Sequence, residues 1–545
     1  MLLEKIKQYL REQNLDAFLI PATNSFLLEG EIPEENKLKP VSLFTGDTGL
    51  ALISQDKNVL FVDSRYTLQA KEQAVDFEVL EVPTQTTISA YLKDHYTHRK
   101  IAYDPSFHSA FAVLKMKAEI PAEFVALLKN PVDLFSDQPQ VCLTEEVAEY
   151  PLVYAGQSVE EKVQLVSQLI KKQNWDAYIF FNPESVSWLL NIRGNLVLYT
   201  PVALKRAVVF ADGHYTVFEK ELPDLKGLKM AADFKTMPEV FLSQLPNIID
   251  SPDLIAGIKA IKTSAQQQHI ANGCLEESKT LCRFLAWLEE HKLEVTEYDC
   301  AVKLQQLRSE NPLYRGDSFE PIVASGPHAA LPHYQLNPNE KVFLRENPLV
   351  LIDTGGQYLN ATTDMTRTIC VTPPTPEMIK RYTQVLKGHI AVATSEMKEG
   401  DSLTLLDQKA RSFLQADGAD YGHSTGHGIG MYLSVHEHPP IVSSSIQVPV
   451  QAGMVFSNEP GYYQENAYGI RLENMLLSLK TENQFIYFEN LIFVPFDGRL
   501  IDFKMLTEGE KDWLSQYHSF IMMQILPQLS QHERTFFNPL MDFFV

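Results

Sequence analysis

An internal repeat is the sequence feature that most restricts the fold of this chain. Residues 10–28 read LREQNLDAFLIPATNSFLL, and residues 170–190 read IKKQNWDAYIFFNPESVSWLL. In the alignment of these segments Asp16 matches Asp176. In each copy a helical pattern ends at an Asn, and an apolar run typical of a buried strand follows. The distance between the copies is too long for a solenoid repeat, so two homologous α/β domains explain it best.

Each copy continues into a predicted β-hairpin with a polar turn. The first hairpin is TGLALISQDKNVLFVDSRYT, and the second is KRAVVFADGHYTVFEK. Prolines and short polar stretches near residues 138–157 and 246–263 mark candidate domain boundaries. We therefore predict an α/β (α+β) protein with three domains, at residues 1–140, 141–260 and 261–545.

The third domain begins with a long helical pattern over residues 264–291, SAQQQHIANGCLEESKTLCRFLAWLEEH. A C-terminal extension begins at about residue 480. Within it, residues 490–496 (NLIFVPF) predict an apolar strand, and a helical pattern with aromatic residues follows.

The composition is typical of a globular protein, and its charge balance disfavours binding to polyanions. The chain has 545 residues, of which 45% are hydrophobic and 21% charged. A net charge of −22 disfavours nonspecific binding to nucleic acid or to an anionic membrane surface. Since no uncharged apolar run approaches 18 residues, we expect no membrane span, and we expect neither nucleic acid nor membrane as a partner.

The cysteines and the N-terminus indicate the compartment. The five cysteines are odd in number and form no C-x-x-C pair, which argues against a disulfide framework and a thiolate zinc site. A reducing compartment is the simpler inference. The first residues, MLLEKIKQYLREQNLDAF, predict an amphipathic helix and lack the apolar core of a signal peptide. We therefore expect a cytoplasmic protein.

Two aspartates lie in a predicted strand pair of the third domain. VLIDTG is typical of a buried strand ending at a Gly-Gly turn, and YLNATTDMTRTICV of the strand that returns. Such a hairpin would bring Asp353 and Asp364 together. Two neighbouring carboxylates repel each other unless a cation lies between them. Taken alone, however, either aspartate is more typical of a turn or of a solvated surface.

Two glutamates and a histidine complete a candidate metal set. Glu459 and Glu473 flank a further predicted hairpin, NEPGYYQENAYGIRLEN. His423 and His427 lie in GHSTGHGIG, which is no H-E-x-x-H helix, because its glycines oppose a helix and no Glu follows the first His. We instead predict a glycine-rich loop that lets backbone approach a ligand. Four carboxylates with one imidazole match two divalent cations, as in a two-metal hydrolase.

Residues from about 261 to 479 resemble the pita-bread metallopeptidases, a family that includes methionine aminopeptidase, prolidase, creatinase and aminopeptidase P. The family's ligands run Asp, Asp, His, Glu, Glu in chain order, so the resemblance implies these metal ligands: Asp353, Asp364, His427, Glu459 and Glu473. FTGDTGLALI and LFVDSRYTLQA are similar to the N-terminal domain of creatinase-type relatives. Two tandem N-terminal domains resemble the long, three-domain form of aminopeptidase P.

This resemblance implies an aminopeptidase that releases the first residue from peptides with proline in second position, by a hydroxide that bridges two metals. It implies that Glu459 moves the proton of the attacking water, and that His423 shuttles a proton or orients a group. His436 and His333 would stabilise the oxyanion or hold the proline side. Arg471, two positions before Glu473, would fix that hairpin.

Several alternatives stay open. The family suggests two Mn²⁺ ions, while the histidine leaves Zn²⁺ or Co²⁺ possible. The resemblance also implies a homodimer. A dipeptidase limited to Xaa-Pro, or a binding protein without catalysis, are the alternative functions. The chain departs from the family pattern at His328, where Asn is common, at Ser424, where Gly is common, and at Leu196, where Asp is common.

Overall fold

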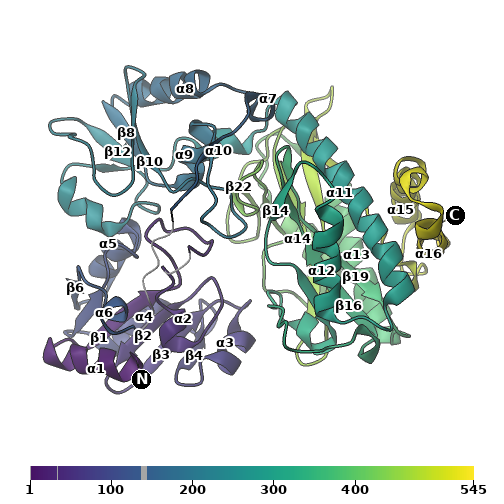
Figure 1. Ribbon diagram of the computed structural model, residues 1–545, viewed down its shortest axis with the longest axis horizontal. Coiled ribbons are helices and arrows are strands. Elements are labelled where there is room, and N and C mark those ends of the chain that lie inside the picture. Colours follow the sequence, from purple (N-terminus) through teal and green to yellow (C-terminus); the bar gives the residue numbers. More distant parts are fainter. Residues whose placement is uncertain (1, 33–34, 137–143, 545) are drawn as a thin grey trace. The chain divides into compact units, whose positions relative to one another are not determined.

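A computed structural model describes residues 2–32, 35–136 and 144–544 (Figure 1). The chain forms two compact units, Met1–Ala256 and Gly257–Val545. The predicted boundary after residue 140 lies outside the described residues, and the boundary after residue 260 stays a prediction. Within the described ranges, no helix is both long and apolar enough to cross a membrane.

The first unit begins with the predicted amphipathic helix, α1 (Leu2–Glu12). Two residues beyond this helix, Asn14 has a φ of 54°, a left-handed conformation that stops a helix. A mixed sheet of order β4-β3-β2-β1-β5-β6 follows. Its strands are β1 (Ala17–Pro21), β2 (Leu50–Ser54), β3 (Asn58–Val62), β4 (Glu78–Glu81), β5 (Lys100–Tyr103) and β6 (Glu123–Ala126). The helices beside it are α2 (Lys39–Ser42), α3 (Thr67–Gln73), α4 (Ile88–Tyr96), α5 (Ala110–Glu119) and α6 (Pro131–Phe135).

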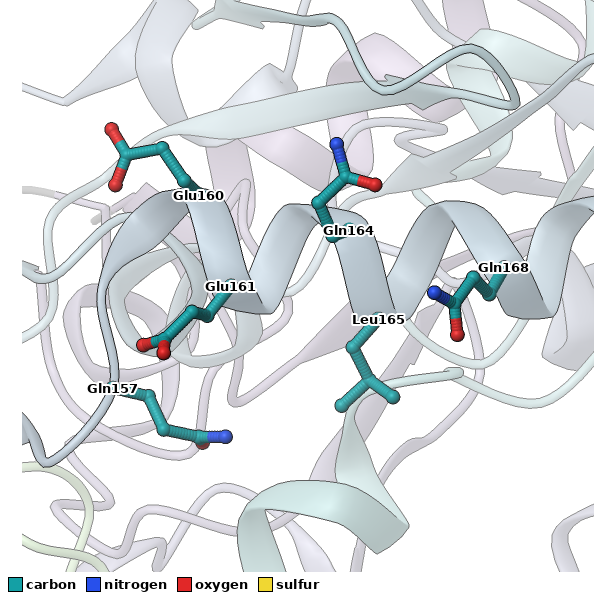
Figure 2. A pocket seen from close by; sticks show the side chains of 6 residues that line it. All are labelled: Gln157, Glu160, Glu161, Gln164, Leu165 and Gln168. Carbon is teal, nitrogen blue, oxygen red and sulfur yellow. The ribbon is translucent and has the colours of Figure 1, made fainter.

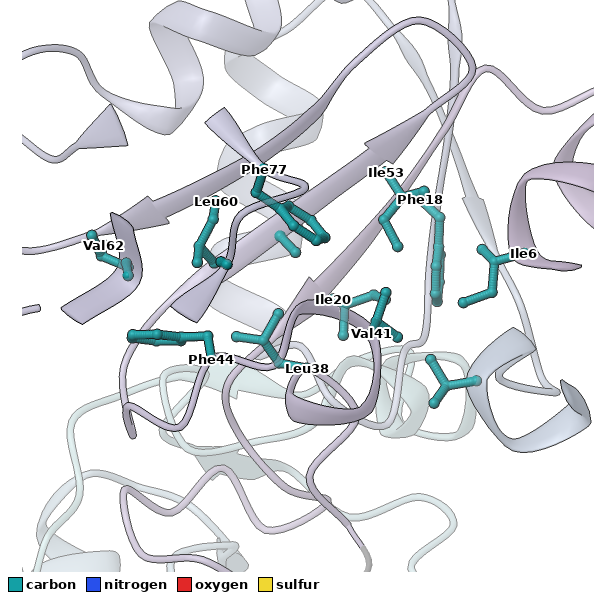
Figure 3. Packing of buried hydrophobic residues seen from close by; sticks show 14 of the residues in the cluster. Ile6, Phe18, Ile20, Leu38, Val41, Phe44, Ile53, Leu60, Val62 and Phe77 are labelled. Carbon is teal, nitrogen blue, oxygen red and sulfur yellow. The ribbon is translucent and has the colours of Figure 1, made fainter. Parts of the chain in front are cut away.

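Alternating side chains of these strands form the first core. Phe18 and Ile20 of β1 lie with Ile53 of β2 on one face of the sheet, and Ile6 of α1 packs against them (Figure 3). Because side chains in a strand alternate between faces, Leu19 and Leu52 belong to a second cluster. The sheet is therefore covered on both faces, which fits the continuous apolar runs of the sequence.

The second sheet of this unit repeats the first. Its order is β11-β10-β8-β12-β13, and Asn174, after α8, has a φ of 62°. Strand β8 pairs antiparallel with β10 and parallel with β12, as β1 pairs with β2 and β5. The elements are α8 (Val159–Lys172), β8 (Ala177–Phe180), α9 (Pro183–Leu189), β10 (Arg206–Phe210), β11 (Tyr215–Phe218), β12 (Met230–Ala232) and β13 (Ile249–Asp250). Both predicted hairpins, β2–β3 and β10–β11, are confirmed.

Small elements complete the first unit. The two-stranded ladder β7 (Ala148–Glu149) and β9 (Ile192–Arg193) accompanies α7 (Leu152–Ala155). Helix α10 (Ala256–Ala260) contains the division between the units.

The second unit begins with α11 (Ser264–His291), which spans the residues predicted to be helical. Thr263 and Gln266 form a reciprocal capping box that fixes its start. The other helices are α12 (Glu297–Arg308), α13 (Pro376–Ala393), α14 (Thr404–Gln415), α15 (Glu508–Phe520) and α16 (Gln531–Met541). Helix α11 contacts β18 (Ala361–Thr362), and α12 contacts β15 (Ile322–Ser325). Helix α13 contacts β23 (Val455–Asn458), β24 (Gly461–Gln464) and β25 (Tyr468–Arg471).

The strands of this unit form several small sheets around one six-stranded sheet. The six-stranded order is β20-β27-β26-β23-β21-β22, and three-stranded sheets are formed by β15-β16-β19 and β14-β17-β18. Their bounds are β14 (Tyr314–Asp317), β15 (Ile322–Ser325), β16 (Leu349–Thr354), β17 (Gly356–Tyr358), β18 (Ala361–Thr362), β19 (Met365–Cys370), β20 (Met397–Lys398), β21 (Gly426–Gly428), β22 (Glu437–Val442), β23 (Val455–Asn458), β26 (Asn474–Lys480) and β27 (Phe485–Asn490). The hairpin β24 (Gly461–Gln464) and β25 (Tyr468–Arg471) is present as predicted.

The strand pair that carries the aspartates is more elaborate than predicted. Strand β16 pairs antiparallel with β19, as expected, but the Gly-Gly segment is no simple turn. Gly356 opens β17, and the short hairpin β17–β18 lies between the two strands. A Cβ on Gly355 would lie 2.0 Å from the Thr363 carbonyl oxygen, so the glycine serves close backbone packing.

The predicted strand at residues 490–496 is wrong. Strand β27 ends at Asn490, and residues 491–497, all buried except the half-buried Phe493, form neither helix nor strand. The carbonyl oxygens of Val494 and Pro495 accept hydrogen bonds from the Arg367 side chain instead of from a neighbouring strand. An apolar run can therefore be buried without a ladder when a side chain satisfies its backbone.

A buried ion cluster joins the first two helices of this unit to a small sheet. Arg308 of α12 donates to Glu277 Oε1 of α11 from Nε at 2.9 Å and from Nη2 at 2.6 Å. Its Nη1 donates to Asp317 Oδ1 of β14 at 3.0 Å, and Tyr358 of β17 donates to Glu277 Oε2. The side chains of Arg308 and Glu277 have no exposed area. Such a cluster is costly to break, because a lone buried charge remains.

We predict that Arg308→Leu lowers the free energy of unfolding by about 3–5 kcal/mol, because Glu277 loses its buried counter-charge. Urea-induced unfolding followed by circular dichroism measures this. Arg315→Leu, at an exposed position on the neighbouring β14, is the control, with an expected change within about 0.5 kcal/mol. Equal effects of the two substitutions would contradict a dominant role of the buried pair.

Candidate metal centre

The five predicted ligands come from separate segments of the second unit. Asp353 lies in β16, and His427 lies in β21. Asp364 directly precedes β19, Glu459 directly follows β23, and Glu473 lies between β25 and β26. All five residues are buried except Glu459, whose side chain is 17% exposed. All five positions therefore lie within strands or directly beside them.

Distances show that the ligands converge. His427 Nε2 lies 3.4 Å from Asp364 Oδ2 and 3.5 Å from Glu459 Oε1. One possible ligand atom each of Asp364, His427 and Glu473 lies within 4.8 Å of the others. Asp353 belongs to the same group, because β16 places it opposite Thr366, whose hydroxyl donates to Glu473. The fold thus gathers four carboxylates and one imidazole.

Burial and mutual repulsion make this arrangement unfavourable without a cation. Burial raises the pKa of Asp353, and the charge of Asp364 raises it further, while Arg471 acts to lower it. Burial also raises the pKa of Glu459, against the effect of His427. For Glu473, burial and the neighbouring carboxylates raise the pKa well above its usual value. These shifts favour protonated carboxyls, which is what a cluster without bound cations requires.

The donor atoms fit a pair of divalent cations. Asp353 Oδ2 accepts from Arg471, and Glu473 Oε2 accepts from Thr366 Oγ1 at 2.7 Å. The second oxygen of each carboxylate, Asp353 Oδ1 and Glu473 Oε1, is buried and has no hydrogen-bond partner among the described residues. Oxygens of this kind suit a hard cation. Each of these two carboxylates is therefore held by one oxygen and offers the other.

His427 is oriented as a ligand by its backbone surroundings. Its Nδ1 donates to the Gly428 carbonyl at 3.0 Å, so Nε2 carries the lone pair and points at Asp364 and Glu459. The His427 amide donates to Ser457 Oγ at 3.0 Å, and Ser457 Oγ donates to Glu459 Oε1 at 3.2 Å. Ser457 thus couples two ligands, and no sequence pattern singled it out.

The predicted glycine-rich loop is partly a strand. Gly426–Gly428 forms β21, which pairs with β22 and β23. A Cβ on Gly426 would lie 1.9 Å from the Ser457 carbonyl oxygen, and one on Gly428 would lie 2.4 Å from the Glu437 carbonyl oxygen. These two glycines serve close packing between strands, and not the close approach of backbone to a ligand.

A chain of hydrogen bonds leads from Asp353 to His423. Arg471 donates to Asp353 Oδ2 and, from Nη1, to the Tyr463 hydroxyl at 2.7 Å. The Tyr463 hydroxyl lies 2.8 Å from His423 Nε2, and His423 Nδ1 donates to the Ser424 carbonyl at 2.7 Å. Since Nδ1 carries the proton, Tyr463 donates to Nε2. Both nitrogens of His423 are thereby engaged, so this arrangement orients the ring.

Arg471 and Tyr463 are both protonated at neutral pH. Burial acts to lower the pKa of Arg471, but Tyr463 and Asp353 outweigh it, and the pKa lies well above its usual value. Burial raises the pKa of Tyr463 to about 12, although Arg471 acts in the opposite direction. Both groups are therefore protonated at neutral pH, as the direction of the hydrogen-bond chain requires. Tyr463 lies inside a predicted hairpin, and nothing in the sequence distinguished it from its neighbour Tyr462.

The remaining predicted residues lie around this group. The ring of His436 lies 4.3 Å from the ring of His427, at a steep angle. His333 is half-buried in a turn after the short helix Gly326–Ala330, and Arg471 Nη2 contacts the adjacent Pro332 carbonyl at 3.4 Å. His436 is thus in ring contact with a candidate ligand, and the turn of His333 is tied to Arg471.

Two of the three departures from the family pattern have defined surroundings in this unit. His328 Nδ1 lies 3.0 Å from Glu297 Oε2, and the His328 ring stacks on Tyr334. Ser424 contributes the carbonyl that orients His423. Leu196, in the first unit, is half-buried, and nothing in the structure explains the substitution.

A shallow pocket in the first unit is not part of this centre. It has a volume of about 480 Å³ and lies along α8, lined by Gln157, Glu160, Glu161, Gln164, Leu165 and Gln168 (Figure 2). Its polar side chains are carboxylates and amides of α8 and of Gln157 just before it, and they include neither a cation nor a nucleophile.

Comparison with known proteins agrees with this geometry. Residues 268–478 match the model of metallopeptidase family M24, and residues 484–538 match the C-terminal region of that peptidase. Residues 3–132 and 137–226 each match a creatinase/prolidase N-terminal domain. A probable Xaa-Pro aminopeptidase P of Laccaria bicolor is 31% identical, over 98% of this chain and 91% of the relative. The chain belongs to metallopeptidase family M24.

Further relatives extend the likeness over the whole chain. A probable Xaa-Pro aminopeptidase P of Coprinopsis cinerea is 31% identical over 98% of this chain and 96% of its own length. The crystal structure of an X-prolyl aminopeptidase from Caenorhabditis elegans, described as a cytosolic enzyme with a di-nuclear active site, has a TM-score of 0.92 and 28% identity. That match covers 100% of this chain and 99% of the nematode enzyme. Two creatinase N-terminal domains followed by a pita-bread domain confirm the predicted fold class.

We predict that the metal-free protein loses stability as pH rises from 5 to 8. A carboxyl whose pKa is raised by folding stabilises the folded state below its unfolded pKa of about 4.3, and this contribution is lost as pH rises through the folded pKa. Glu473→Gln removes one such group, so its melting temperature should fall less over this range. Differential scanning calorimetry after treatment with a chelator measures the effect.

Addition of Mn²⁺ provides the opposite control. Bound metal should raise the melting temperature of the unmodified protein, and more at pH 8 than at pH 5, because the ligands must lose protons. Glu473→Gln should show little of this rise, whereas the exposed Glu482→Gln should behave as the unmodified protein. A pH-independent melting temperature of the metal-free protein would contradict the raised pKa values.

Proposed function

We propose that this protein is a dinuclear metallo-aminopeptidase that releases the N-terminal residue from peptides with proline in second position. The observation that carries the proposal is the cluster of four carboxylates and His427, in which Asp353 Oδ1 and Glu473 Oε1 are buried without a partner among the described residues. Whole-length likeness to proteins named Xaa-Pro aminopeptidase P supports the substrate class.

The proposed ligands are Asp353, Asp364, His427, Glu459 and Glu473. We propose Mn²⁺ as the native ion, because the donors are mostly carboxylate oxygens. A pair of divalent cations held there supplies Lewis acidity toward the scissile carbonyl and lowers the pKa of a water molecule.

Glu459 is proposed as the group that moves protons. It is the most exposed of the five ligands, and only the weak donor Ser457 is bonded to its Oε1 among the described residues. A carboxylate in this position can accept a proton from the attacking water and then donate it to the leaving nitrogen.

Residues beside the ligands are proposed to orient the substrate. His436, in contact with the His427 ring, and His333, in the turn that Arg471 contacts, are proposed to hold the carbonyl oxygen or the proline side. His423 is proposed to act through its fixed orientation, since Tyr463 and Ser424 engage both its nitrogens. Arg471 is proposed to hold Asp353 and the hairpin before Glu473 in place.

A dedicated site is useful because the Xaa-Pro bond is a tertiary amide. It has no N–H, and the ring fixes the φ angle of proline. An aminopeptidase that depends on a hydrogen bond from the scissile N–H would lose that contact, whereas a site shaped for the ring accepts this substrate.

We also propose a homodimer in the cytosol. The family resemblance supports the dimer, which sedimentation velocity would test. The likeness to the nematode enzyme, which is described as cytosolic, supports the location, together with the four cysteines of the described residues, which are free and buried.

We predict that the Mn²⁺-loaded protein cleaves Arg-Pro-Pro and leaves Arg-Ala-Ala intact, with Arg-Pro a poorer substrate. Asp364→Asn should reduce kcat/KM at least about 100-fold with an unchanged fold, because a ligand is lost. The exposed Asp512→Asn on α15 is the control. Chromatography of released arginine measures the rates. Rapid cleavage of Arg-Ala-Ala would contradict proline specificity, and cleavage of Arg-Pro alone would indicate a dipeptidase.

A second prediction concerns the hydrogen-bond chain to His423. Tyr463→Phe removes the hydroxyl between Arg471 and His423, so we expect kcat to fall about 10–100-fold. Steady-state kinetics with Arg-Pro-Pro measures this. Tyr487→Phe on β27, whose side chain is partly exposed, should leave kcat unchanged. If Tyr463→Phe kept full activity, the chain would have no role in turnover.

A further inference from the structure

Arg367 of β19 is a fully buried cation with neutral acceptors. Its residue is 1% exposed, and no carboxylate among the described residues accepts a hydrogen bond from it. Its guanidinium lies 4.3 Å from the centre of the Phe496 ring. A buried charge is costly, so its many bonds to oxygen atoms are needed to hold it there. The location of those oxygens indicates what Arg367 is for.

Some of the acceptors belong to the backbone of the metal centre. Arg367 Nη1 donates to the carbonyl of Glu473 at 2.6 Å and to the carbonyl of Thr366 at 2.8 Å. Strand β19 places Thr366 opposite Asp353, and the next residue, Arg367, points to the other face of the sheet. Thr366 therefore donates a hydrogen bond to the Glu473 carboxylate on one face of the sheet. Arg367 donates to the Glu473 backbone carbonyl from the opposite face.

The remaining acceptors belong largely to the C-terminal region. Arg367 Nη2 donates to the Val494 carbonyl at 2.7 Å and to the Tyr517 hydroxyl of α15 at 3.0 Å. The Tyr517 hydroxyl also accepts from the Val494 amide at 3.0 Å and lies 3.0 Å from the Ile492 carbonyl. Tyr517 thus fixes the irregular segment 491–497 on Arg367 (α15 is labelled in Figure 1). The guanidinium group presents its N–H donors in fixed directions within one plane, so it can bond several acceptors at defined positions.

We propose that Arg367 and Tyr517 are positioning residues of the metal centre, through which the C-terminal region fixes the backbone of Glu473. The inference rests on the proposed function, because it takes Glu473 as a metal ligand. Arg367 joins Glu473 to Tyr517 by one planar group, so a change at Tyr517 is transmitted to the carbonyl of the ligand residue. Partners that orient a ligand typically contribute about 10–100-fold in metal affinity.

The test compares two tyrosines that are changed in the same way. Tyr517→Phe removes the hydroxyl that Arg367 and Val494 share, and Tyr382→Phe removes an equally buried hydroxyl on α13 that accepts from the Asp497 amide at 3.0 Å. Titration calorimetry with Mn²⁺ alone should show at least one ion bound about 10-fold more weakly by Tyr517→Phe. Tyr382→Phe should bind Mn²⁺ as the unmodified protein does, even if its melting temperature falls.

Two further measurements separate positioning from general destabilisation. Electron paramagnetic resonance of the Mn²⁺-loaded protein reports the coupling between neighbouring ions. This spectrum should change in Tyr517→Phe and stay unchanged in Tyr382→Phe. Arg367→Lys keeps the charge but has a single nitrogen in place of Nη1 and Nη2. It cannot reproduce the bonds that these two atoms make to Glu473, Val494 and Tyr517, so it should also weaken Mn²⁺ binding. It serves as the second variant if Tyr517→Phe does not fold.

The outcomes distinguish this inference from the proposed function. If the unmodified protein bound no Mn²⁺, the proposed function would fail. If it bound Mn²⁺ and Tyr517→Phe or Arg367→Lys bound it equally well, only the positioning role would be overturned. Equal weakening in Tyr382→Phe would also overturn it, because Mn²⁺ affinity would then not depend on the bond between Tyr517 and Arg367.

Discussion

Electrostatic repulsion among largely buried carboxylates is the constraint on which the metal centre of the second unit depends. Asp353, Asp364, Glu459 and Glu473 are brought together where burial raises the pKa of three of them. The fold tolerates this because it is built for positive charge at that place, supplied by divalent ions together with Arg471. The strand pair β16–β19 and the connections beside it are the framework that keeps the carboxylates close.

Strand β19 shows how a single element serves two purposes. Its alternation directs Thr366 toward the Glu473 carboxylate and Arg367 toward the opposite face. The polar pocket and the packing of the C-terminal region are therefore linked by adjacent residues. Gly426 and Gly428 of β21 contribute in another way. They let the backbone of β21 lie against the carbonyls of Ser457 and Glu437, where a side chain would not fit.

Much of the fold was predictable from sequence because the signals were local and repeated. Asn14 and Asn174 end the equivalent helices in the left-handed conformation, and the strands after them have the same neighbours in both sheets. The five carboxylate and imidazole positions followed from the order of residues in a family. The strand expected at 490–496 failed because its backbone partners are side chains distant in sequence, Arg367 and Tyr517. Tyr463 and Ser457 were missed because a hydroxyl gains its role only from a geometry that folding creates.

The contacts of Arg367 also bear on the order in which the protein matures. All five proposed ligands precede the segment 491–497 and α15 in the chain, so they leave the ribosome first. Until those parts follow, Arg367 lacks the Val494 carbonyl and the Tyr517 hydroxyl as hydrogen-bond acceptors, and a guanidinium with unused donors favours water over the interior. The backbone of Glu473 therefore gains its full set of supporting contacts only after the C-terminal region has been synthesised.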